Sequence, residues 1–387
     1  MPPSVVRILA TVSVCLLTRQ NAVAQTASVP LKPLWTIRDD EDKIVVEKPN
    51  QVRMSGATSW ISDDGRLQLI HVDATGKVLG TAGRKGSGPG EFQRIGWFGI
   101  GVNDSLYVWD DQLRRVSVFS SDGKFKRTEV LENGASQPAV FGRMRNGDWL
   151  ISTARSLNEQ ALGLSRDSVD INVAKSMHDV MRRLFTVPGR KMVAAKEGDG
   201  VYRMDLPAGS MIGLTGCDAG IVVAVGESRS VRAYDPQGKL LREVIMKDIG
   251  KPWDVAARTQ AIESYSSSAP QPMREAIRKE FEKHVPNPMM HNPQFKIGRD
   301  GRIWAGSYDE PYPMTIVKND GSNAARALFP MNFVFTEQDL NSAVGIQYLP
   351  DGKSVQRFEL PLDVRGVKDA PNALHPTLGR CETGSVR

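Results

Sequence analysis

The feature that most constrains this chain is a repeated pattern of short strands and tight turns. Residues 83–127 hold a loop of glycines and a proline, then four short extended segments separated by polar turns. Residues 106–127 align without a gap with residues 221–242, so that Asp122-Gly123-Lys124 meets Gln237-Gly238-Lys239. Two distant segments that share the spacing of strands and turns indicate a repeat architecture.

Weaker copies of the pattern follow along the chain, each with a DG or NG turn before a strand. We count six units, at residues 57–92, 93–131, 137–188, 192–246, 293–328 and 329–360. A unit of about 40 residues with four short strands has the size of a β-propeller blade. The sequence therefore predicts an all-β fold, a six-bladed β-propeller over residues 25–360. An early strand, such as residues 43–46, is expected to close the ring by joining the last unit.

The first unit looks shorter than the second. Leu67 lies 9 residues before Gly76, whereas Leu106 lies 17 residues before Gly123. If Leu67 and Leu106 are equivalent, the first blade lacks eight residues, which is most of a strand or a hairpin turn.

One segment, at about residues 252–285, interrupts the β pattern. Met273, Ile277, Phe281 and His284 recur at helical spacing, after a Ser-Ser-Ala-Pro break. The pattern predicts two short helices, inserted between the fourth and fifth units and lying over one end of the ring. They are interpreted either as a helical cap or as a lid that gates a ligand.

The N-terminus predicts export. Residues 1–24 hold Arg7, an apolar run too short to span a membrane, and an Ala22-Val23-Ala24 cleavage pattern, so they read as a signal peptide. The mature chain would be periplasmic or secreted, with a C-terminal tail at residues 361–387. In an oxidising compartment Cys217 and Cys381 either pair or stay as two thiols.

Charge argues against a nucleic-acid partner. The formal net charge of +6 comes from basic residues scattered among acids, with no block or stripe that would follow a phosphate backbone. We expect no membrane span and a monomer.

The sequence also resembles a known family of repeats. The run Gly86 to Phe92, the following SLYVWDDQLRRVSVF and the DG turn are similar to the NHL-type repeat of exported bacterial six-bladed β-propellers. The resemblance is strongest over residues 83–127 and 219–243. It implies the fold but not one activity, because such propellers include interaction scaffolds and relatives of lactonases and lyases.

The glycine loop does not read as a phosphate site. No Gly-Lys-Ser/Thr follows it, and Pro89 removes one backbone N–H, so we interpret it as a crossover between blades. In the lactonase-like propellers that the fold resembles, acidic and Asn residues hold a divalent cation such as calcium at the axis. Asp110 and Asp111 are the candidates for that role. The alternative is that Asp110 caps a turn by accepting backbone N–H groups.

Four further residues are candidates for ligand contact because aromatic and basic loop residues suit adaptable recognition: Arg94, Trp253, Tyr308 and Tyr312. The five histidines form no metal-binding motif, and no nucleophile elbow occurs. The sequence therefore predicts a binding scaffold for a protein, peptide or glycan, without a cofactor. The alternative is a metal-dependent propeller hydrolase, lactonase-like, or a lyase.

Overall fold

The computed structural model describes fourteen stretches of the chain, and the rest of this account concerns these alone: residues 30–38, 45–101, 104–132, 137–155, 162–206, 210–214, 220–225, 228–246, 254–284, 294–298, 302–306, 313–318, 320–339 and 341–367.

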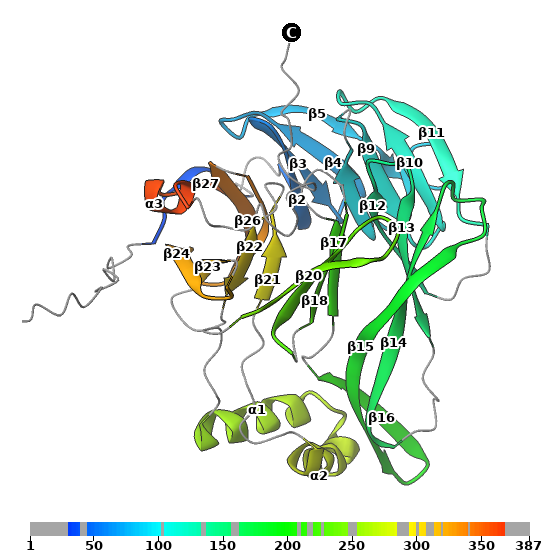
Figure 1. Cartoon of the computed structure of the whole chain (residues 1–387), viewed down its shortest axis with the longest axis vertical. Coiled ribbons are helices and arrows are strands. Elements are labelled where there is room, and N and C mark those ends of the chain that lie inside the picture. The colour runs from blue at the N-terminus through cyan, green and yellow to red at the C-terminus, as the bar shows by residue number, and fades with distance from the viewer. Residues whose placement is uncertain are drawn as a thin grey trace, which may run out of the picture.

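Six antiparallel sheets form a ring of blades (Figure 1), as the repeats predict. Blades 1 and 2 have four strands each: β2 (Pro49–Ser55), β3 (Thr58–Asp63), β4 (Gln68–Val72) and β5 (Val78–Ala82), then β8 (Trp97–Ile100), β9 (Leu106–Asp110), β10 (Arg115–Phe119) and β11 (Phe125–Val130). Blade 3 has five: β12 (Pro138–Arg143), β13 (Trp149–Arg155), β14 (Gly163–Ala174), β15 (Arg182–Glu197) and β16 (Gly200–Leu206).

Blades 4 and 5 return to four strands: β17 (Ser210–Leu214), β18 (Ile221–Val225), β19 (Ser230–Tyr234) and β20 (Leu240–Ile245), then β21 (Gln294–Ile297), β22 (Ile303–Gly306), β23 (Pro313–Val317) and β24 (Asn323–Leu328). Blade 6 combines the two ends of the ring: β25 (Phe333–Gln338), β26 (Ser342–Leu349), β27 (Gly352–Glu359) and β1 (Pro33–Arg38). The remaining elements are β6 (Arg84–Lys85), β7 (Glu91–Phe92), α1 (Val255–Ser267), the 3₁₀ helix η2 (Gln271–Met273), α2 (Arg274–His284) and α3 (Leu362–Arg365).

The ring closes through an early strand, as predicted, but the segment differs. β1 pairs with β27, whereas residues 45–46 lie in the loop before β2. Across the same junction the buried Arg357 donates hydrogen bonds to the carbonyls of Ala57 (2.6 Å) and Gly56 (3.2 Å) in blade 1. These bonds tie the last blade to the first.

The prediction of an incomplete first blade is wrong, because blade 1 has all four strands. Leu67 is equivalent to Arg114, not to Leu106. Both adopt a left-handed conformation (φ 54° and 51°) in the turn between the second and third strands, and each lies 9 residues before a glycine of the next turn, Gly76 or Gly123.

The DG-type turns link neighbouring blades. Gly76, Gly123, Gly238 and Gly321 have positive φ, and the position that a Cβ would take at each meets the outer strand, or the residue that follows it, of the preceding blade. At Gly123 that contact is 2.9 Å to the carbonyl oxygen of Thr81. Glycine is required there both for the backbone conformation and for the close approach. The repeated glycine therefore sets the spacing of the blades.

Apolar side chains fill the spaces between blades. Between blades 1 and 2 the buried cluster includes Trp60, Phe92, Phe98 and Phe119. Between blades 5 and 6 it includes Trp304 and four phenylalanines, and it also takes in Val364 of α3. The core of the ring thus extends a few residues into the predicted C-terminal tail.

Candidate functional site: the crossover face and its lobe

The end of the ring at which the chain enters each innermost strand is here called the crossover face. The innermost strands are β2, β8, β12, β17, β21 and β25. Around the axis, contacts run from β21 through β25, β2, β8 and β12 to β17. Segments 45–48, 83–96 and 329–332 lead into β2, β8 and β25, so they lie at this face. The turns between second and third strands lie there too. This face therefore gathers residues from several blades.

The glycine loop is the crossover from blade 1 to blade 2, as predicted, and it is folded around its own carboxylate. The carboxylate of Glu91 accepts the N–H of Gly88 (2.8 Å) and a bond from Arg84 (2.8 Å). These two contacts, the Gly88 N–H first, hold the pKa of Glu91 below its ordinary value. Arg115 donates to the carbonyls of Gly88 and Glu91. An internal anion thus occupies the place that a phosphate would need.

Asp110 holds the crossover onto blade 2. It is fully buried at the end of β9, and its two oxygens accept backbone N–H groups from the next turn, Gln112 (3.0 Å) and Leu113 (2.8 Å), and from the incoming segment, Gln93 (2.7 Å) and Arg94 (3.4 Å). A cation at Asp110 would have to displace these donors. The four donors describe a turn-capping role for this carboxylate, and its role as a metal ligand stays a prediction.

Blade 1 repeats this arrangement with Asp63, which the sequence analysis missed. Buried at the end of β3, Asp63 accepts the N–H groups of Gly65 (3.0 Å), Arg66 (3.4 Å), Glu47 (3.1 Å) and Lys48 (3.0 Å). The signal was present, because Asp63-Asp64 and Asp110-Asp111 each begin the turn that ends in the left-handed residue. The mistaken alignment of Leu67 with Leu106 hid it.

Asp111 and Arg94 lie together at the crossover face and form an ion pair with each other. The hydrogen bond that the guanidinium of Arg94 donates to Asp111 raises the pKa of Arg94 above its ordinary value. Arg94 keeps 64% of its side chain exposed, so part of the guanidinium faces solvent. Of the predicted site residues, the structure brings together Arg94, Asp110 and Asp111.

The other predicted site residues fall outside the described stretches. This holds for Trp253, Tyr308 and Tyr312, for Cys217 and Cys381, and for the signal peptide at residues 1–24. The described residues on either side of the YDEPY loop, Gly306 at the end of β22 and Pro313 at the start of β23, lie at the crossover face. The contact residues predicted in these loops stay predictions.

The innermost strands contain few acidic residues. Within the bounds given above, the six strands contain one acidic residue, Glu337, and three basic residues, Arg53, Arg143 and Lys296. Glu337 accepts the N–H of Met54, so it links blades 6 and 1. Arg53 lies over the ring of Phe98 in blade 2, 5.4 Å from its centroid. Among the described residues no group of three His, Cys, Asp or Glu side chains is placed to hold a metal ion.

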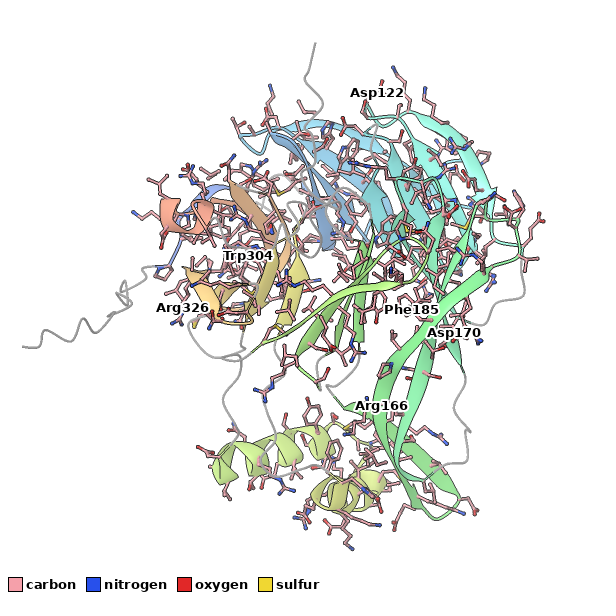
Figure 2. All side chains as sticks on the ribbon, viewed as in Figure 1. Asp122, Arg166, Asp170, Phe185, Trp304 and Arg326 are labelled. Atoms are coloured by element: carbon pink, nitrogen blue, oxygen red, sulfur yellow. The ribbon has the colours of Figure 1, made fainter. Side chains whose placement is uncertain are left out.

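Blade 3 extends beyond the ring at the crossover face. β14 pairs with β13 only as far as Ser168, and residues 163–167 continue past it, still paired with β15. β15 in turn pairs with β16, so that residues 163–166 and 191–206 form a small sheet outside the ring. In Figure 1 the two long strands run from the ring to the helices. Figure 2 marks this path, with Phe185 and Asp170 near the ring and Arg166 further out.

The helical insertion packs on this extension, and we call the two together the lobe: residues 163–166, 191–206 and 254–284. Two helices form on either side of the Ser-Ser-Ala-Pro break, as predicted. The lobe has a buried core of its own, made by strand and helix residues: Val193, Ala195, Met204, Ile262, Ala269, Met273, Ile277 and Phe281. The helices are therefore supported by blade 3, although they follow blade 4 in the chain.

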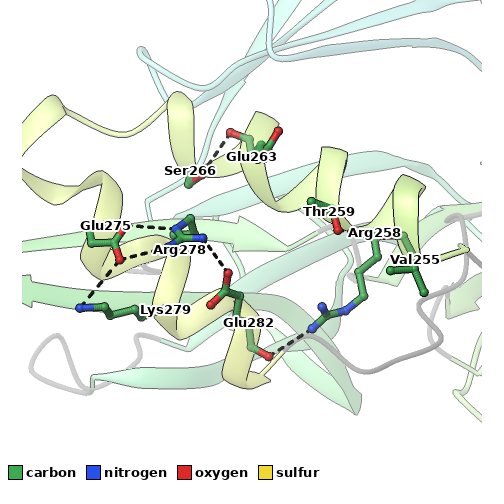
Figure 3. Close-up of polar contacts among 9 residues, drawn as sticks. All are labelled: Val255, Arg258, Thr259, Glu263, Ser266, Glu275, Arg278, Lys279 and Glu282. Atoms are coloured by element: carbon green, nitrogen blue, oxygen red, sulfur yellow. Dashed lines mark hydrogen bonds and ion pairs between the residues drawn. The ribbon is translucent and has the colours of Figure 1, made fainter.

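Charged side chains stabilise the outer surface of the helices (Figure 3). Arg278 bridges Glu275 (3.0 Å) and Glu282 (3.0 Å), one turn before and one turn after it on α2. The guanidinium of Arg258 on α1 donates to the carbonyl of Glu282, near the end of α2. The Arg278 bridges stabilise α2 itself, and the Arg258 bond joins α1 to α2.

The geometry of the ring agrees with the comparisons with known proteins. Residues 38–157 match the model of the DUF5128 family, described as a 6-bladed beta-propeller. The chain is a six-bladed β-propeller. A member of the DUF4221 family from Bacteroides vulgatus ATCC 8482 resembles it with a TM-score of 0.50 and 10% identity, over 86% of this chain and 97% of that chain.

Two further solved structures are similar. A protein of Bacteroides fragilis NCTC 9343, provisionally assigned as exported, has 10% identity and a TM-score of 0.49, over 83% of this chain and 92% of that chain. Virginiamycin B lyase from Staphylococcus aureus has 10% identity and a TM-score of 0.40, over 81% and 95%. No curated protein matches the sequence. At these identities the similarity concerns the fold alone, and the resemblance to NHL-type propellers is consistent with it. None of the helices in the described stretches has the length and apolar character needed to cross a bilayer.

Proposed function

We propose that this propeller is an exported binding scaffold whose crossover face docks a protein, peptide or glycan. The observation that carries the proposal is the composition of the six innermost strands. The six innermost strands carry three basic residues and one acid, and that acid accepts a backbone N–H of the neighbouring blade. A cation site needs several oxygen ligands that converge. This composition favours recognition over metal-assisted hydrolysis.

The position of the lobe supports the same function. Loops and insertions placed on a rigid scaffold commonly carry binding residues. Here the crossovers of the ring, the exposed part of Arg94 and a lobe with its own core all lie at one end of the propeller. Export is proposed from the signal pattern of residues 1–24, and a periplasmic or secreted location follows from it. The aromatic residues Trp253, Tyr308 and Tyr312 are proposed as contact residues at the same face.

The test uses the mature chain, beginning at Gln25, screened against peptide and glycan arrays. For the ligand that binds, Arg94→Glu should weaken affinity about tenfold. The substitution replaces a guanidinium that contacts the ligand by a carboxylate, which either repels an acidic group of the ligand or leaves that group without a partner. Arg127→Glu is the matched control, since Arg127 is a comparably exposed arginine with an acidic partner, Glu129, on the outer strand β11. It should leave affinity unchanged. Equal weakening by both variants would place the ligand elsewhere.

The alternative, a hydrolase with one axial cation, stays a prediction with its own readout. Calorimetric titration of the metal-free propeller with Ca²⁺, together with a lactone-hydrolysis assay, tests it directly. Heat of binding and turnover, with no array ligand, would replace the scaffold proposal by the hydrolase. Array binding without either would support the scaffold.

A further inference from the structure

The lobe meets the ring through a narrow neck in blade 3. On the ring side, β13 stops pairing with β14 at Ser168, which faces Pro188 on β15. On the lobe side, β16 begins to pair with β15 at Lys191, which faces Arg166 on β14. Between these points only Asp167 on one strand and residues 189–190 on the other connect the two parts of the sheet. The described link is therefore two strands wide.

The ladder of hydrogen bonds is interrupted at this neck. The pairing register shifts between Arg166 and Ser168, so that Asp167 faces two residues, Gly189 and Arg190. One residue opposite two is a β-bulge, which bends a strand and locally breaks the ladder. Pro188, which has no N–H to donate, stands next to it. The sheet is thus least constrained at the point where it is narrowest.

A half-satisfied carboxylate occupies the bulge. The side chain of Asp167 is only 4% exposed, and its Oδ2 accepts a bond from Nε of Arg190 (3.1 Å), an arginine that is 57% exposed. Its other oxygen, Oδ1, is buried and has no hydrogen-bond partner in the described part of the chain. That oxygen lies against Gly189, where any Cβ would overlap it. A buried carboxylate oxygen without a donor is unfavourable, and rotation of the neck toward water would satisfy it.

From these contacts we propose that the lobe is a hinged cover of the crossover face, which turns at the Asp167 bulge. The ion pair of Asp167 with Arg190 is the latch that holds the present arrangement. The unsatisfied Oδ1 of Asp167 favours the turned arrangement, because water can donate a hydrogen bond to it there. The lobe can move as a unit because its core contains only its own residues. The proposal concerns a motion of the free protein and does not depend on which ligand binds.

Blade 3 supplies a matched control on the same two strands. Asp170 and Arg183 also pair across β14 and β15, at 3.7 Å, but they lie where β13 still pairs with β14. Arg190→Gln removes the latch, and Arg183→Gln removes an equivalent pair within the ring. Both arginines are about half exposed, so neither change leaves a cavity in a core.

The experiment measures distances between spin labels on non-canonical amino acids at Lys85, in the exposed crossover loop, and Ser264, on the exposed side of α1. The unsubstituted propeller should show two distances. Arg190→Gln should raise the ratio of the minor to the major population about fivefold, and Arg183→Gln should leave it unchanged. Gly189→Ala, which forces the carboxylate out of the bulge, should act like Arg190→Gln. A single narrow distance that no variant moves, or an equal response to both arginine variants, would overturn the hinge.

Discussion

Blades 1 and 2 differ from blade 3 in what happens at the end of the second strand. In blades 1 and 2, a buried aspartate at the end of the second strand accepts four backbone N–H groups, two from the incoming crossover and two from the turn that follows the strand. In the part of blade 3 that the structure describes, no aspartate stands at the end of β13. Instead, its long strands β14 and β15 extend beyond the ring and support the lobe. Among these three blades, the buried aspartate fixes the crossover in two, and the extended hairpin carries a separate module in the third.

The largest expected effect tests the crossover that Asp110 holds onto blade 2. Asp110→Ala leaves four backbone N–H groups without their acceptor and should lower the free energy of unfolding by about 4 kcal/mol. Asp111→Ala removes a partly exposed ion pair and should lower it by less than about 1 kcal/mol. Urea unfolding followed by tryptophan fluorescence compares the two. Losses of similar size would mean that the buried carboxylate does not organise the crossover.

The next prediction separates the lobe from the ring. Phe281 is 1% exposed in the core of the lobe, where it stacks on Tyr265 at 5.5 Å. Phe281→Ala should destabilise the lobe by about 3 kcal/mol, so that amides of α1, α2 and β16 exchange faster. Amides of β9 and β10 should keep their protection, because no residue of blade 2 belongs to that core.

Phe333→Ala is the control for this separation. Phe333 is buried between blades 5 and 6, where it stacks on Phe329. Its loss should lower the protection of the ring, with the lobe following. If Phe281→Ala lowers the protection of β9 and β10 as much as that of α2, the lobe and ring form one cooperative unit, and the contrast drawn above fails.

The sequence predicted the ring because its signals are local. DG and NG turns between short apolar runs report hairpins directly, and their spacing reports the repeat. The turn at Leu67 misled the alignment, because the left-handed residue there is neither glycine nor asparagine. Only backbone geometry shows that it matches Arg114.

The lobe was only half predictable, for a different reason. The helices follow from the spacing of Met273, Ile277 and Phe281, but their partner does not, since it lies some 80 residues earlier in the chain. The long strand β15 contains Pro188-Gly189, a pair that reads as the end of a strand. In the structure a bulge accommodates Pro188-Gly189, and no local sequence pattern predicts this bulge.

A smaller effect concerns the glycines that space the blades. At Gly321, with φ of 83°, a Cβ would overlap the carbonyl oxygen of Ile245 in blade 4. At Gly147, with φ of 90°, a Cβ would meet nothing within 4 Å. Both alanine variants carry backbone strain, so Gly321→Ala should cost about 2 kcal/mol more than Gly147→Ala. Denaturant midpoints measure the difference, and equal midpoints would show that these turns do not set the spacing of the blades.

The smallest expected effect is a pH dependence that distinguishes a crossover from the lobe. The pKa of Glu91 is lowered from 4.5 by the N–H of Gly88 and by Arg84, so the folded state favours the charged form. The resulting stabilisation is fully present above about pH 4.5 and is lost as the pH falls through the lower, folded pKa. Glu91→Gln should therefore flatten the change in urea midpoint between about pH 3 and pH 5. Glu263→Gln, on the exposed side of α1, should leave the profile unchanged. A profile that Glu91→Gln does not alter would mean that the carboxylate inside the glycine loop is not what holds this crossover folded.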